Sequence, residues 1–378
     1  MIAVAVLLQI AQMPSVPTPA PDPDIIVSGK TTAEAKRILE ACIADRCTPD
    51  KEIKASLVYA TRQMLDGDYP AARQTLLTAR HRNAAFDKTY PMQVSDLHRA
   101  LNRLSTLDGW RDSARLSAVD ATDALRAGLP SGDPTILSQR LFSASQLARE
   151  GRIIGATQIY NDVADKARQR GQYAVEAQAL FDGAVLYATL ASLDPVYRNS
   201  AQEWADRITH RTEPEFVEMR SGLSLLRTKL AALAAKPQDR AAIYSAAQPA
   251  DGNAAILLDE PKLQVLPDDQ QLAGGMAREG VPEWADVGFW VRPDGSVADL
   301  AVVRQSQARP GSWLGEKLKA VSGRRYAPLQ GSVGTRGLYR VERYSLVHVV
   351  QSTIGTHMPV RARIGEIDTM DMTPLYRS

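Results

Sequence analysis

The sequence predicts a multidomain chain of the α and α+β classes: an N-terminal array of α-helical hairpins over residues 31–250, followed by a small ββαβ domain over residues 284–350. Two patterns along the chain predict this order. From Thr31 to about Ala247, Ala, Leu, Arg and Gln recur at helical spacing, whereas from Asp286 onward apolar and polar residues alternate with the period of a β-strand. A length of 378 residues agrees with two or three domains.

The composition is that of a globular protein with nearly balanced charge. Hydrophobic residues make up 44% and charged residues 23% of the chain, which is enough apolar material to bury a core. The formal net charge is only +2, so the chain lacks the strong positive charge that nucleic acids or anionic membranes attract. We therefore expect no nucleic-acid partner.

Residues 1–30 have the features of an export leader. The apolar run Met1–Leu8 is much shorter than the roughly 20 residues of a membrane-spanning helix, so we expect no stable transmembrane anchor. It fits the apolar core of a signal peptide, and the Pro-rich stretch Pro14–Pro23 fits the segment after a cleavage site. A basic region before the run is missing, which leaves two alternatives: a start downstream of the true one, or a frayed apolar terminus. We favour export to the periplasm.

Cys42 and Cys47 are the two cysteines of the chain and lie in one short segment. Their spacing fits neither a redox C-x-x-C pair nor the duplicated pairs of a zinc site. A disulfide is the simplest interpretation, and it agrees with an oxidising compartment. Continued helix would point the two side chains apart, so the helix must end near Ala44 or Asp45 for the bridge to close.

A repeat runs through the helical half. Gly67, Gly109 and Gly151 lie 42 residues apart, and each is expected to precede the second helix of a hairpin, with a small residue one turn into that helix. Further helices are expected from about Pro195 to Arg211 and from Pro214 to Ala235. The aligned positions are Gly67, Tyr69, Ala72, Leu76 and Ala79; Gly109, Arg111, Ala114, Ala118 and Ala121; and Gly151, Ile153, Ala156, Tyr160 and Val163.

This progression of Gly, aromatic, Ala, large apolar residue and Ala resembles the second helix of the tetratricopeptide repeat. The resemblance implies a scaffold that binds a protein partner. The chain departs from the family in its period, which is longer than about 34 residues, and in lacking the Trp-Leu-Gly-Tyr pattern of the first helix. An irregular helical bundle with coincidental turns is the alternative.

Residues 251–283 are expected to form a linker, because helical periodicity ends near Gln248 and Pro, Gly and Asp follow. Val287, Phe289 and Val291 then mark a first strand, and Pro293-Asp294-Gly295 marks a hairpin turn. The second strand is expected over Val297–Val303, with Ala298, Leu300 and Val302 on one face.

A short helix should follow, with Ser312 as its N-cap and Gly323 as its stop. Strands over Arg325–Pro328 and Leu338–Val350 complete the ββαβ order, and residues 351–378 form a C-terminal tail. Such a domain buries one face of its sheet under its helix.

The strand ending in Arg304-Gln305-Ser306, the helix, and the run Arg324-Arg325-Tyr326-Ala327-Pro328 are similar to the TonB C-terminal domain over about residues 266–350. The resemblance implies an envelope protein that pairs a strand edge with an extended segment of a partner, such as an outer-membrane transporter. The membrane anchor and the long Pro, Lys and Glu-rich spacer of an energy transducer are not recognised here. We therefore expect strand-edge binding, but not energy transduction, to carry over.

The leading candidate for the partner-binding strand is Leu338–Val350, through Tyr339, Arg340, Val341, Glu342 and Arg343. In the alternative, the tail Ser352–Ser378 folds back and covers that edge. Asp24–Ser28 resembles the acidic and apolar box that transporters present to TonB domains; the alternative, which we favour, is that it marks the start of the ordered domain after the Pro-rich leader.

No catalytic signature is recognised in the sequence. The five histidines, His81, His98, His210, His348 and His357, are scattered singly. We therefore assign no catalytic, cofactor-binding or metal-binding residue, and we expect a protein-binding adaptor of the envelope, not an enzyme. An enzyme without a recognisable short motif and a structural subunit of an envelope assembly remain alternatives.

Overall fold

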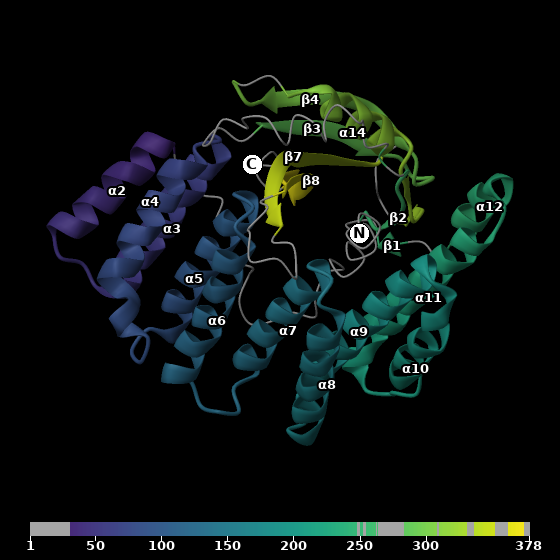
Figure 1. The fold of residues 1–378 in the computed structure, drawn as a ribbon, viewed down its shortest axis with the longest axis horizontal. Helices are drawn as coiled ribbons and strands as arrows, with labels where there is room; N and C mark the ends of the chain where they lie inside the picture. The colour runs from purple at the N-terminus through teal and green to yellow at the C-terminus, as the bar shows by residue number, and fades with distance from the viewer. Residues whose placement is uncertain are drawn as a thin grey trace.

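A computed structural model of the chain describes residues 31–247, 250–251, 255–261, 263, 283–307, 310–330, 336–351 and 362–373. It has the predicted fold class, an array of paired helices followed by a small α+β domain with an antiparallel sheet (Figure 1). The expected leader, including the segment Asp24–Ser28, lies outside the described residues.

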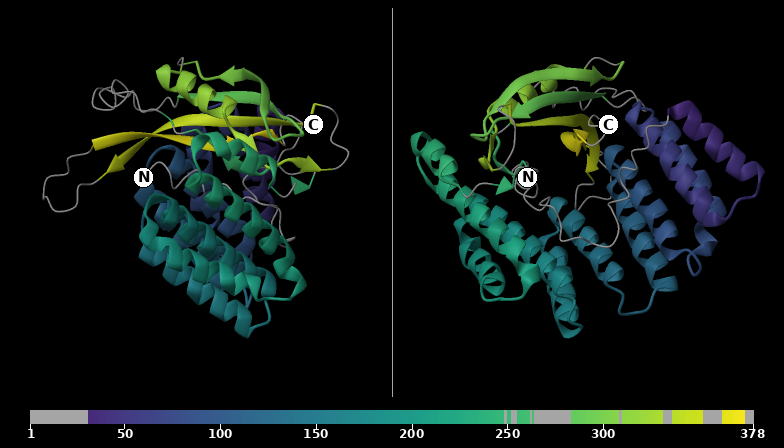
Figure 2. Two further views of the ribbon diagram at one scale, coloured as in Figure 1. Left: turned by 90° about the vertical axis from the view of Figure 1, so that its right-hand side faces the viewer. Right: turned by 180° about the vertical axis from the view of Figure 1, so that it is seen from behind.

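The array curves as an arc around the C-terminal sheet (Figures 1 and 2). Most of its helices pack in pairs, and short 3-10 helices at Ala84–Phe86, Pro195–Tyr197, Pro214–Phe216 and Pro237–Asp239 lie between some of them. The α-helices are α2 (Thr32–Ala44), α3 (Pro49–Leu65), α4 (Tyr69–Asn83), α5 (Pro91–Leu107), α6 (Arg111–Gly128), α7 (Pro134–Arg149), α8 (Ile153–Gln169), α9 (Tyr173–Leu193), α10 (Arg198–Thr209), α11 (Val217–Ala234) and α12 (Arg240–Ser245).

The three repeat glycines have the role that the sequence predicts. Gly67, Gly109 and Gly151 adopt φ values of 85°, 74° and 76°, which only glycine reaches without strain, and each separates the two helices of a hairpin. The amide after each glycine donates to the carbonyl five residues earlier, as in a Schellman helix ending; these pairs are Asp68 to Gln63, Trp110 to Ser105 and Arg152 to Leu147. The hairpin prediction is therefore confirmed.

The small residue of each repeat lets the paired helices approach closely. Ala72, Ala114 and Ala156 are all buried, and so are the apolar positions that follow them on the same face, namely Leu76, Ala118, Tyr160, Ala79, Ala121 and Val163. The helices expected near residues 195–211 and 214–235 are also present, each opened by a short 3-10 helix.

The predicted disulfide between Cys42 and Cys47 is present, with the two Cα atoms 5.1 Å apart. Helix α2 ends at Ala44, and the Cys47 amide donates to the Cys42 carbonyl at 2.9 Å. The bridge therefore closes across the end of a helix, as its spacing requires.

The main sheet of the C-terminal domain has the strand order β4-β3-β7-β8, and all of its neighbouring strands are antiparallel. One face packs under helix α14 (Ser312–Ser322), with Trp313, Leu314 and Val321 against Val287 and Phe289. Two small pairs flank it, β1 with β6 and β2 with β5. The strands are β1 (Ala250–Asp251), β2 (Leu257–Asp259), β3 (Glu283–Val291), β4 (Val297–Gln305), β5 (Arg325–Tyr326), β6 (Leu329–Gln330), β7 (Leu338–Gln351) and β8 (Ala362–Asp371).

Several details of this domain differ from the sequence prediction. Strand β8 lies in the segment expected to be a tail, and β2 lies in the expected linker. The strand predicted over Arg325–Pro328 is only the two-residue β5, and β6 begins after it at Leu329. Ser312 is the first residue of α14, with Gly311 as its N-cap.

The face predicted for the second strand was also wrong. Val297 and Leu300 pack against the core, whereas Val302 is 40% exposed. The register of β4 against β3 shifts twice, and Asp299 lies in the left-handed region with φ 51°. Extra residues at such bulges break the two-residue alternation on which the prediction relied.

The two modules share buried cores at both ends of the array. Leu65, Tyr69 and Leu107 of the first two hairpins pack with Trp284 and Met370 of the sheet domain. At the other end, α11 and α12 pack against β2 through Leu225, Ala232, Tyr244, Ile256 and Leu258. The sheet domain thus contacts both the beginning and the end of the helical arc.

Candidate functional site

Strand β7, the predicted partner-binding strand, does not lie at an edge of the sheet. Strand β3 pairs with it from Leu338 to Leu346, and β8 pairs with its other side from Glu342 to Gln351. Beyond the end of β8, the Met372 amide donates to the Val341 carbonyl at 2.8 Å. The expectation of an open β7 edge is therefore wrong, and part of the tail folds back over it, as in the alternative.

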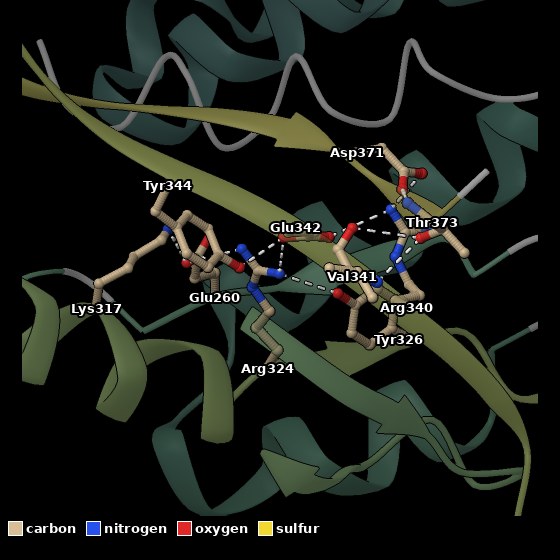
Figure 3. Close-up of polar contacts among 10 residues, drawn as sticks. All are labelled: Glu260, Lys317, Arg324, Tyr326, Arg340, Val341, Glu342, Tyr344, Asp371 and Thr373. Atoms are coloured by element: carbon tan, nitrogen blue, oxygen red, sulfur yellow. Dashed lines mark hydrogen bonds and ion pairs between the residues drawn. The ribbon is translucent and has the colours of Figure 1, made fainter. Parts of the chain in front are cut away.

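The side chains of β7 alternate between two buried faces, and each face carries charged residues. On the α14 face, Glu342 accepts hydrogen bonds from Arg324 Nη1 at 2.7 Å and from Tyr344 Oη at 2.6 Å (Figure 3). Arg340 Nη2 forms an ion pair with Glu342 Oε1 at 3.2 Å. Although burial alone would raise the pKa of Glu342, the guanidinium groups of Arg324 and Arg340 hold it at about 2. Glu342 is therefore ionised under all physiological conditions.

The same charged network extends to β2 and α14. Glu260, which directly follows β2, accepts from Lys317 Nζ at 2.6 Å and from Arg324 Nη2 at 3.2 Å (Figure 3). Burial lowers the pKa of Lys317, and the nearby Glu260 carboxylate opposes this shift. These contacts fix the helix and the small strand pair against β7, so the network is a structural element of the domain.

The opposite face of β7 is joined to the helical array through Arg343. Its guanidinium donates to both carboxylate oxygens of Asp286, at 2.6 and 2.9 Å, and to the carbonyls of Met64 and Leu65, each at 2.8 Å. It also lies 3.8 Å from the centre of the Trp284 ring. Met64 and Leu65 end α3, so Arg343 satisfies carbonyls that have no partner within that helix.

Tyr339 and Arg340 complete the set of predicted residues. Tyr339 packs against Trp290 with the ring centres 5.2 Å apart, and Arg340 Nη2 donates to Asp371 at 3.0 Å. Val341 is buried in the core that the two modules share. The structure therefore gathers all five predicted residues, but it uses them to hold β7 against its neighbours.

Strand β8 is held against the second hairpin by two arginines. Arg103 binds both carboxylate oxygens of Asp368, at 3.0 and 2.7 Å, and Arg111 binds Glu366 at 2.6 Å. Both acidic side chains project toward the array, on the same face as the buried Met370. The sequence analysis missed these residues because it assigned no structure to the tail.

The outer edge of β8 is the regular edge of the sheet. It pairs with β7 over ten residues without a register shift, whereas β4, at the opposite edge, carries two bulges that blunt it. In the part of the chain that the structure describes, no strand pairs with the outer side of β8.

The direction of the β8 backbone groups follows from the Met372 bond to Val341. Hydrogen-bonded and non-bonded pairs alternate along an antiparallel ladder, so the amides of Glu366, Asp368 and Met370 face β7. Those of Gly365, Ile367 and Thr369 face away from β7, and no strand among the described residues pairs with them.

Comparisons with known proteins give no relative for this chain: no protein-family model, no curated protein and no solved structure matches it significantly. Among the described residues, no helix is both long enough and apolar enough to cross a membrane. The same residues contain no group of three His, Cys, Asp or Glu side chains placed to hold a metal ion.

Proposed function

We propose that this chain is an exported adaptor of the bacterial envelope that binds an extended segment of a partner protein along the outer edge of β8. The proposal keeps the strand-edge binding implied by the resemblance to the TonB C-terminal domain, but moves it from β7 to β8. The observation that carries it is the regular β8 edge, whose outward amides have no strand partner among the described residues.

The rest of the fold supports this role. Two arginines and the buried Met370 fix β8 on the array, so the edge is held rigid before a partner arrives. The array resembles tetratricopeptide repeats, which bind proteins, and its convex surface remains for a second partner. The Cys42–Cys47 disulfide supports export, because such bonds persist in oxidising compartments.

Substitution of Thr369 tests the edge. Thr369→Pro removes an outward amide without removing a β7–β8 hydrogen bond, so the fold should persist while partner capture from the native envelope is lost. Thr369→Ala is the matched control, because it changes the side chain but keeps the amide. Circular dichroism and thermal unfolding verify the fold, and cross-linking with mass spectrometry locates the captured segment.

Unchanged capture by a folded Thr369→Pro variant would rule out pairing at this edge. Export is tested separately by fractionating native cells and alkylating free thiols. A periplasmic chain with Cys42 and Cys47 protected from alkylation is expected, whereas a cytoplasmic chain with both thiols reactive would contradict the proposal.

A further inference from the structure

The third hairpin differs from the first two at the position that meets the sheet. Leu65, Leu107 and Arg149 lie 42 residues apart and end α3, α5 and α7 respectively. Leu65 and Leu107 are buried in the core shared with the sheet, whereas Arg149 is exposed. The sheet therefore covers this position in the first two hairpins. In the third hairpin the same position is the charged Arg149, which the shared core does not include.

Arg149 lies close to β8, although it does not contact a carboxylate. Although part of the Arg149 side chain is open to solvent, the protein atoms around it and the positive charge of Arg103 lower its pKa, and the nearby Asp368 carboxylate opposes this shift. Arg103 is already paired with Asp368, and Arg111 with Glu366. Among the described residues, no acidic group lies within ion-pair distance of Arg149.

Other charges nearby do not neutralise this position. Glu150, the next residue, is influenced by Arg111, Arg115 and Arg152, so its negative charge is shared among several cations. Where the second and third hairpins lie beside β8, arginines thus outnumber carboxylates. A bound anion would be favoured there over a neutral group.

The geometry of strand addition gives this charge a target. Residues that are opposite one another in neighbouring strands point to the same face, with their Cβ atoms about 5 Å apart. In a strand added to the outer edge of β8, the side chains opposite Glu366 and Asp368 would therefore point toward the array. This added strand would lie beyond β8, on the side of the third hairpin.

From this placement we propose that the segment bound at β8 carries a carboxylate on its array-facing side, and that Arg149 binds it. The inference rests on the proposed function and deepens it. The sheet edge supplies main-chain hydrogen bonds, and the third hairpin selects an acidic side chain. The array and the sheet then bind one extended segment together.

Two labelled octapeptides test the inference with the full chain: one of alternating Glu and Val, and one in which Gln replaces each Glu. Fluorescence anisotropy should show the Glu peptide binding about tenfold more tightly to the wild-type chain, the size expected for one charge-assisted hydrogen bond. Arg149→Gln should bring the affinity for the Glu peptide down to that for the Gln peptide. Arg168→Gln is the control, because it removes the same charge near the end of α8, where Arg168 pairs with Asp165, and it should change neither affinity.

The outcomes separate this inference from the proposed function. If both peptides bind equally to the wild type, and Thr369→Pro abolishes both, edge pairing stands and acid selection fails. Acid selection by Arg149 also fails if Arg149→Gln keeps the preference for Glu. If neither peptide binds the wild-type chain, or if sedimentation shows that a second copy occupies the edge, the inference is overturned.

Discussion

The guanidinium of Arg343 in β7 donates to the main-chain carbonyl of Leu65, the last residue of α3, at 2.8 Å, across 278 residues of sequence. The same guanidinium pairs with Asp286, which is fully buried. One side chain therefore neutralises a buried carboxylate in the sheet and completes the end of a helix in the other module.

Replacing Arg343 by Met should destabilise the protein strongly. The change removes the guanidinium that binds both carboxylate oxygens of the buried Asp286, and breaking a buried ion pair typically costs about 3–5 kcal/mol in the free energy of unfolding. Arg304→Met is the matched control, because Arg304 donates to the same Leu65 carbonyl at 3.2 Å but is 45% exposed. It should cost less than about 1 kcal/mol. Equal losses in urea unfolding would show that Arg343 is not the principal link.

Gly67→Ala should destabilise the chain more than Gly151→Ala. Both glycines adopt a left-handed conformation, so either change costs about 1–2 kcal/mol in backbone strain. An added Cβ at Gly67 would also overlap the Trp284 indole, whereas one at Gly151 meets nothing within 4 Å. Thermal unfolding measures the difference, and tryptophan fluorescence reports whether Trp284 moves. Equal losses for the two variants would contradict this packing.

Lys229→Met should stabilise the protein near neutral pH. Lys229 Nζ is buried without a hydrogen-bond partner among the described residues, and burial lowers the pKa of Lys229 to about 8. Between about pH 8 and 10 the unfolded chain holds more protons at this site, so wild-type stability rises with pH. The advantage of the variant should shrink by about 3 kcal/mol across this window. A gap that does not change with pH would show that the pKa of Lys229 is the same in the folded and unfolded chains, which would contradict the prediction.

Asp182→Asn should show the opposite dependence. Burial raises the pKa of Asp182 to about 7, while Gln178 Nε2 donates to its carboxyl at 2.7 Å. The folded chain keeps this proton where the unfolded chain has lost it, so wild-type stability falls as pH rises from about 4 to 7. The variant and the wild type should be similarly stable at pH 4. At pH 8 the variant should be more stable by several kcal/mol, on the order of 4. A constant difference in denaturant titrations would refute this.

The helical hairpins could be predicted because their signals are local. A turn glycine, a small residue one helical turn later and the apolar face around it lie within one short stretch, as with Gly67, Ala72 and Leu76. The alternation of Val287, Phe289 and Val291 gave β3 for the same reason.

Strand β8 could not be predicted in this way. Ile364, Ile367 and Met370 are spaced by three residues, which does not suggest a strand, and the array-facing positions Glu366 and Asp368 are charged. They are tolerated there because Arg103 and Arg111, more than 250 residues away, neutralise them. The role of Glu260 could not be predicted for the same reason, since its partners Lys317 and Arg324 come from other elements. Ion pairs between residues far apart in the sequence make these charged residues acceptable, and the pattern of neighbouring residues does not reveal such pairs.

The contacts of the sheet domain with both ends of the array also have a mechanical consequence. An open stack of helical hairpins contacts only its neighbours, so bending along its length is its softest motion. Here α3 is tied to β7 by Arg343, and α11 and α12 are tied to β2 by a buried apolar core. A stack that contacts the sheet domain at both ends cannot change its curvature unless one of these two contacts breaks. The width of the sheet domain therefore sets the distance between the first and last hairpins, and with it the curvature of the array.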